Sequence, residues 1–139
     1  MKHLLEENYE FDFNLFGICC HERDYRLCWA VNSTLKLNLS KSKNDIELIL
    51  NSNSRPNAKF PVFSFINSVS LDEYYLIKNK CHSTWLIPEK SHFDFLLLIK
   101  SDEKKSYNFF LNKLNTIPFI LKANYVIVEE LKSKENLIF

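Results

Sequence analysis

The chain has 139 residues, of which 46% are hydrophobic and 25% are charged, and its net charge is +1 at pH 7. This composition excludes a disordered chain, and the length predicts one domain with a core of its own. The chain has a single glycine, Gly17, which weighs against phosphate-binding loops, dinucleotide-binding turns, nucleophile elbows and EF-hand loops, because all of them need glycine. The near-neutral net charge weighs against a dedicated nucleic-acid-binding domain.

Targeting and membrane features are not expected. Two acidic residues follow only two leucines near the first residue, which is unlike a signal peptide. The longest apolar stretch, residues 93–99, contains Asp94 and is too short to span a bilayer. We therefore expect a cytoplasmic protein with reduced cysteines.

The first half of the chain predicts a strand followed by a helix. Residues 9–20 alternate in polarity, which indicates a half-buried strand. Asp24 is a suitable N-cap for a helix that runs to about residue 37. One face of this helix is apolar, with Tyr25 and Trp29 one turn apart beside it. The apolar positions are Leu27, Cys28, Val31 and Leu35.

Four further strands are predicted at residues 46–50, 59–69, 74–77 and 93–99. Pro61 indicates an edge strand or a bulge within the second of them. The last is apolar on both faces, as a central strand would be. The polar residues 51–57 between the first two strands predict a surface loop.

A second helix is predicted to start at Ser101 and to end before Pro118, with an apolar stripe at helical spacing. The stripe consists of Tyr107, Phe110, Leu111 and Leu114. A last strand covers residues 119–128, and residues 129–139 form a C-terminal tail.

The predicted order is β-α-β-β-β-β-α-β, and each helix has one apolar stripe to bury. We therefore predict a single α+β domain over residues 1–139, a two-layer sandwich of a mainly antiparallel sheet with both helices on one face. The last β-α-β unit could add a parallel pair by a right-handed crossover. An uncovered second sheet face would expose aromatic side chains and invite a partner.

Three separated blocks of the sequence resemble the IPExxxVDY family of small bacterial proteins. The signature block is Ile87-Pro88-Glu89, three residues, and then Phe93-Asp94-Phe95, where phenylalanine replaces the usual valine and tyrosine. The other blocks are residues 13–29, which include Asp24, Tyr25, Arg26 and Trp29, and residues 131–139. The resemblance implies a bacterial protein but no activity, because the family is named for its motif.

Asp94 lies within an apolar strand, where an unpaired carboxylate would be costly. We expect Arg26 to bind it and so to join the first helix to the sheet. A catalytic or ligand-binding carboxylate is the functional alternative. Glu89 follows the extended Ile87–Pro88 step and is expected to cap or pair with the start of the next segment.

The cysteines and histidines are numerous enough for a zinc site, but their spacing does not favour one. The candidates are Cys19, Cys20, His21, Cys28, Cys81 and His82. There is no C-x-x-C pair, and adjacent residues on a strand point to opposite faces. We therefore predict structural thiols, with no metal and no cofactor. A nucleophilic Cys19 or Cys20 would need His82 or His92 beside it and lacks a glycine loop for an oxyanion hole.

Two aromatic or apolar groups are candidate contact surfaces. A stacking platform for RNA could consist of Phe63, Phe65, Tyr74 and Tyr75, but these residues could equally pack beneath the helices. The tail ends in Leu137, Ile138 and Phe139, which either tuck into the domain or bind a partner.

The absence of common catalytic motifs favours a non-catalytic protein-binding or adaptor module, with a protein partner or self-association. It would use an exposed sheet face or the tail. The alternatives are a small metal-thiol protein or enzyme centred on Cys20, His21 and Glu89, and an RNA-associated factor.

Overall fold

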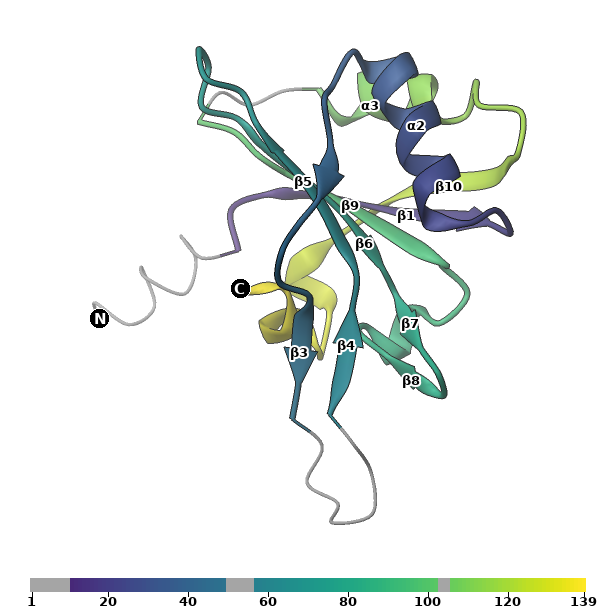
Figure 1. The fold of residues 1–139 in the computed structure, drawn as a ribbon, viewed down its shortest axis with the longest axis vertical. Coiled ribbons are helices and arrows are strands. Elements are labelled where there is room, and N and C mark those ends of the chain that lie inside the picture. Colours follow the sequence, from purple (N-terminus) through teal and green to yellow (C-terminus); the bar gives the residue numbers. More distant parts are fainter. Residues whose placement is uncertain (1–10, 50–56, 103–105) are drawn as a thin grey trace.

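The computed structural model describes residues 11–49, 57–102 and 106–139, and a six-stranded sheet forms its centre (Figure 1). The strand order is β10-β1-β9-β6-β5-β2, and each neighbouring pair is antiparallel. The strands are β1 (Asn14–Cys20), β2 (Ser40–Lys41), β5 (Val62–Ile66), β6 (Glu73–Lys78), β9 (Phe95–Lys100) and β10 (Ile120–Val126).

Two helices, α2 (Asp24–Leu35) and α3 (Tyr107–Leu114), pack on one face of this sheet. The apolar side of α2 buries Leu27 and Val31, and α3 buries Phe110 and Leu114 against the same core. The apolar side of each helix, repeated every 3.6 residues, packs on the face of the sheet formed by every second residue of its strands. Amphipathic helices and strands bury their apolar sides in this way. The predicted α+β fold with both helices on one face is confirmed.

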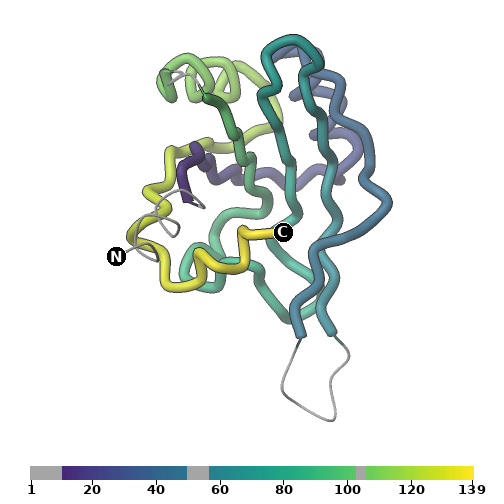
Figure 2. The backbone as a smooth tube through the Cα atoms, turned by 90° about the vertical axis from the view of Figure 1, so that its left-hand side faces the viewer, coloured from purple at the N-terminus to yellow at the C-terminus, as the bar shows by residue number. Residues whose placement is uncertain are grey.

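The opposite face of the sheet is also covered. It packs against a hairpin of β3 (Ile46–Leu48) and β4 (Ala58–Phe60), against Leu86 and Ile87 just before the short helix η1 (Pro88–Lys90), and against the short helices η2 (Val128–Glu130) and η3 (Lys134–Leu137). Figure 2 shows the C-terminal segment on this side, away from the two α-helices. Because the sheet has cover on both faces, its central strand β9 is buried from Phe95 to Ile99.

Several predicted boundaries change in the structure. Pro61 separates β4 from β5, so the predicted strand 59–69 is two strands with different partners. Ser106 rather than Ser101 occupies the N-cap position of α3, and its side chain makes no capping hydrogen bond. The two-residue strands β2, β7 (Lys80–Cys81) and β8 (Thr84–Trp85) are too short to show a period.

The expected parallel pair at the C-terminal end is not formed. Both β9 and β10 pair with β1, one on each side and each antiparallel to it. They therefore run in the same direction, but β1 occupies the position between them. The connection through α3 crosses over β1.

The outer edge of β10 is partly closed by a side chain. The Asn115 amide donates a hydrogen bond to the Ala123 carbonyl (3.3 Å), and its Oδ1 accepts one from the Ala123 N–H (3.0 Å). This amide takes the place of a neighbouring strand at the middle of the edge, where open backbone groups would invite pairing with another chain. Within the part of the chain that the structure describes, no helix is long and apolar enough to cross a membrane.

Candidate functional site

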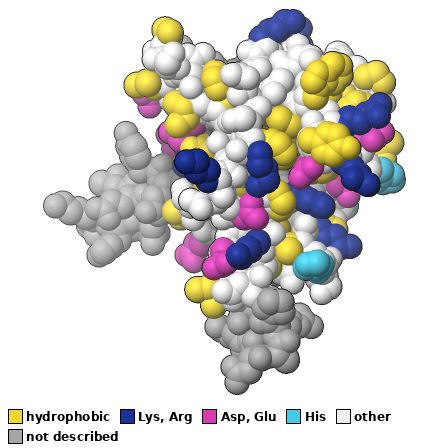
Figure 3. Space-filling view, viewed as in Figure 1, with side chains coloured by type: hydrophobic (Ala, Val, Ile, Leu, Met, Phe, Trp, Pro, Cys, Tyr) yellow, Lys and Arg dark blue, Asp and Glu magenta, His cyan; other side chains and the backbone are white. Residues whose placement is uncertain are grey.

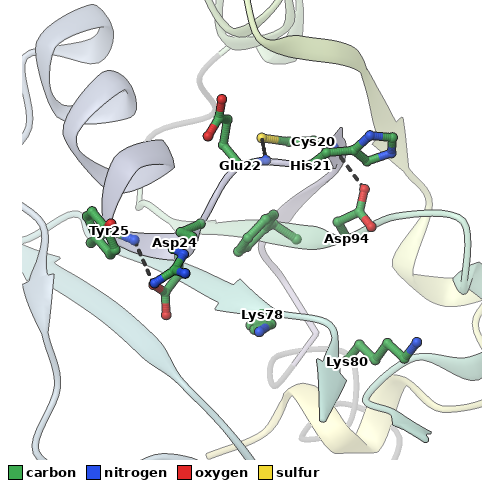
Figure 4. A pocket seen from close by; sticks show the side chains of 10 residues that line it. Cys20, His21, Glu22, Asp24, Tyr25, Lys78, Lys80 and Asp94 are labelled. Atoms are coloured by element: carbon green, nitrogen blue, oxygen red, sulfur yellow. Dashed lines mark hydrogen bonds between the residues drawn. The ribbon is translucent and has the colours of Figure 1, made fainter. Parts of the chain in front are cut away.

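A cleft of about 590 Å³ opens where β1 ends and α2 begins (Figure 4). The end of β1 and the following turn form one side, and residues from the ends of β6 and β9 form the other. Its lining combines thiol, imidazole, carboxylate and amine groups. The lining residues are Cys20, His21, Glu22, Arg23, Asp24, Tyr25, Lys78, Lys80, Asp94 and Phe95.

The expected pairing of Asp94 with Arg26 is wrong. Asp94 lies just before β9, where its Oδ2 accepts a hydrogen bond from the Cys20 N–H (2.8 Å) and its own N–H donates to the Ile18 carbonyl (2.9 Å). The carboxylate thus continues the β1–β9 ladder beyond its last backbone pair. Arg26 instead lies 3.8 Å from Glu22 and over the ring of Phe119.

The thiols near this cleft are held in the protonated form. Burial raises the pKa of both Cys19 and Cys20, and it raises that of Cys28 to about 11. The Cys19 thiol donates to the His92 carbonyl oxygen (3.3 Å), so that contact is with the backbone and not with the imidazole. Thiols with raised pKa values are poor nucleophiles at neutral pH. Among residues 11–49, 57–102 and 106–139, no three His, Cys, Asp or Glu side chains gather as metal ligands would.

Glu89 is not among the residues that line the cleft with Cys20 and His21, and it holds the C-terminal segment instead. Its Oε2 accepts a hydrogen bond from the Ser133 N–H (2.8 Å), where η3 begins. Burial opposes ionisation of Glu89, but hydrogen bonds from its own backbone and from Ser133 and Lys132 outweigh it, so its pKa is lowered. The expectation that Glu89 binds the start of the next segment is wrong, because its partner Ser133 lies 44 positions further along the chain.

The apolar tip of the tail is divided between core and surface. Leu137 is fully buried against the second sheet face, so it is not accessible to a partner in this fold. Ile138 and Phe139 remain about half exposed, and the Phe139 ring packs edge-on against Tyr75. Of the candidate tail residues, only these two keep a surface that a partner could contact.

The signature segment is organised by a buried amide. Asn79 is fully buried; its side-chain N–H₂ donates to the carbonyls of Lys90 (3.1 Å) and Phe93 (2.9 Å), and its Oδ1 accepts from the Ile87 N–H (2.9 Å). Pro88 opens η1, where proline is well tolerated. These contacts give the signature a structural role, because they fix the connection between β6 and β9.

The same segment explains the single glycine of the chain. The ring of Phe93 lies directly on Gly17 in β1, and a methyl group at Gly17 would overlap three ring carbons. Glycine is therefore needed here for space rather than for an unusual backbone conformation.

The aromatic residues considered as an RNA platform do not form one on the surface. Phe63, Phe65 and Tyr74 pack in the core beneath the helices, and Tyr75 faces the opposite side of the sheet. The alternation of residues along these strands therefore reflects packing on the two covered faces of the sheet.

The prominent exposed aromatic residues on α2 are Tyr25 (63% exposed) and Trp29 (69% exposed), which we call the α2 ridge. They lie one turn apart on the outward side of the helix, and Tyr25 also lines the cleft. Figure 3 shows apolar side chains at this surface among basic and acidic ones. Their positions beside the apolar stripe of the predicted helix were the feature of the sequence that indicated this exposure.

Comparisons with protein-family models, with curated proteins and with solved structures each gave no match.

Proposed function

We propose that this protein is a non-catalytic protein-binding module and that the α2 ridge is its contact surface. The observation that carries the proposal is the pair of large aromatic side chains, Tyr25 and Trp29, exposed side by side on a helix whose other face is anchored in the core. Isolated exposed apolar residues are ordinary, but tyrosine and tryptophan together are typical of the residues that dominate binding energy at interfaces.

The alternatives receive less support from the geometry. A metal-thiol site needs Cys20, His21 and Glu89 together, whereas Glu89 binds the tail and the Cys20 thiol has a raised pKa. An RNA platform needs exposed aromatic residues on the sheet, and these lie in the core.

As part of the same proposal, the protein belongs to the IPExxxVDY family and works in the bacterial cytoplasm. The resemblance of the signature block supports the family and the bacterial source. The four cysteines are all free thiols in the structure, which suits a reducing compartment.

Site-specific photo-crosslinking in cells tests the proposed surface. A photoreactive residue at the exposed Ser33, one turn beyond Trp29, should capture a protein that the same residue at Val69 does not capture. Val69 is 92% exposed and lies outside α2, so it is a matched surface control.

Binding of the purified captured protein then decides the role of the ridge. Trp29→Ala should weaken binding by about tenfold or more, as loss of a central aromatic contact does. Leu121→Ala, at a residue 66% exposed on β10, should leave it unchanged. Equal capture at Ser33 and Val69, or equal effects of the two alanine variants, would refute the proposal.

A further inference from the structure

The charges around the α2 ridge indicate the kind of partner that fits it. We propose that the α2 ridge and the adjoining cleft bind an acidic protein segment that carries an apolar side chain beside its carboxylates. This inference rests on the proposed function, because it names the partner class for the same surface.

The carboxylates of the cleft already have partners within the protein. Asp94 accepts a hydrogen bond from the backbone of Cys20 (2.8 Å), and Asp24 accepts one from the Tyr25 N–H (2.7 Å) at the start of α2. Glu22 lies 3.8 Å from Arg26. Each of these three carboxylates therefore already has a hydrogen-bond donor or a cation of the protein beside it.

The basic side chains of the cleft are not compensated in the same way. Arg23 and Lys78 are exposed, and the ion pairs found among the described residues include neither of them. Lys80 is exposed and lies over the Trp85 ring, 5.1 Å from its centroid, which leaves its charge without a carboxylate. Figure 4 shows Lys78 and Lys80 across the cleft from Glu22.

Aromatic anchors and basic groups thus adjoin on one surface. Tyr25 belongs to both the ridge and the cleft, so a bound segment can place an apolar side chain against the ridge and its carboxylates over Arg23 and Lys78. Arginine binds carboxylates in a bidentate manner, and complementary charge sets the register of such a complex.

An acidic protein segment fits this surface better than RNA does. The net charge of the chain is only +1, so it lacks the strong positive potential that binding a phosphate backbone requires. Single-strand binding surfaces combine stacking aromatics with a continuous basic groove, whereas basic and acidic side chains alternate here.

Selection from a random peptide display library tests the partner class. The full chain is the target, and the Tyr25→Ala/Trp29→Ala double variant serves for counter-selection. Enriched peptides should combine net negative charge with an apolar residue. Their binding, measured by fluorescence anisotropy, should weaken as salt rises.

Charge reversal provides the decisive comparison. Arg23→Glu with Lys78→Glu should weaken binding of an enriched peptide by about tenfold. The matched control, Lys43→Glu with Lys113→Glu, changes two exposed lysines that do not line the cleft and should leave binding unchanged. Circular dichroism confirms that each variant is folded.

The outcomes separate this inference from the proposed function. Enrichment of neutral or basic peptides, no enrichment, or equal effects of the two charge reversals would overturn the acidic partner class. The cross-linking at Ser33 would still decide independently whether the ridge binds a protein. Tighter binding of a single-stranded RNA oligonucleotide than of any enriched peptide would overturn the inference in favour of a nucleic acid.

Discussion

We expect Gly17→Ala to lower the free energy of unfolding by about 3 kcal/mol or more. The new methyl carbon would lie less than 3.0 Å from Cγ, Cδ2 and Cε2 of Phe93, so a whole edge of the ring would have to move. The ring cannot retreat with its backbone, because the Phe93 N–H donates to Lys90 (3.1 Å) and its carbonyl accepts from Asn79 (2.9 Å).

The magnitude follows from the two ways in which the protein can respond. Overpacking costs about 1–3 kcal/mol when neighbours adjust, and loss of a buried phenyl ring costs about 3–5 kcal/mol. Phe93 is only 3% exposed and its backbone is held, so the cost lies toward the second range. A domain stabilised by about 5–15 kcal/mol would remain folded and measurable.

Urea unfolding of a double-mutant cycle measures the effect. Phe93→Val replaces the phenyl ring with the valine that is usual at this position in the IPExxxVDY family, which the signature block resembles. The smaller side chain should relieve the clash, so the two substitutions should show a coupling free energy of about 1–3 kcal/mol. Val69→Ala, at an exposed turn, should change stability by less than about 0.5 kcal/mol. A loss below about 1 kcal/mol for Gly17→Ala, or additive effects in the cycle, would refute the packing argument.

Three further substitutions test other contacts. Asn79→Ala should cost about 3 kcal/mol in equilibrium unfolding, because it leaves buried backbone groups without partners; a cost below about 1 kcal/mol would contradict this. The lowered pKa of Glu89 means that its carboxylate stabilises the fold above the unfolded-state pKa of about 4.3, and that this stabilisation is lost as pH falls through the folded-state pKa. Glu89→Gln should therefore reduce stability by about 0.5–1 kcal/mol at neutral pH, a small value because the bond to Ser133 is exposed, and the difference should disappear in acid; a difference that persists in acid would exclude the charge as its cause. Asn115→Ala should cost about 1–2 kcal/mol and allow concentration-dependent self-association through the freed edge at Ala123, measured by sedimentation velocity; a variant that stays monomeric would show that the amide does not guard the edge.

Some features of the site lay within reach of sequence reasoning, and others did not. The pattern of α2 indicated that Tyr25 and Trp29 sit beside its buried stripe. Glu89 was expected to bind the start of the next segment, but it binds the distant Ser133 instead. The partner of Asp94 was mispredicted because Arg26 was chosen for the bidentate bond that an arginine can make with a carboxylate. The actual donor is a backbone N–H, that of Cys20, 74 positions away in the chain.

What the sequence by itself determined is the local structure and the class of fold. Helical and strand periods report which side of each element is buried, and burial is the dominant stabilising effect, so the helices, the main strands and their shared face were predictable. The tertiary structure alone decided the cover on the second sheet face, the separation of β9 from β10 by β1, and the joining of the α2 ridge to the cleft. These features depend on contacts between residues far apart in the chain, for which local periodicity has no signal.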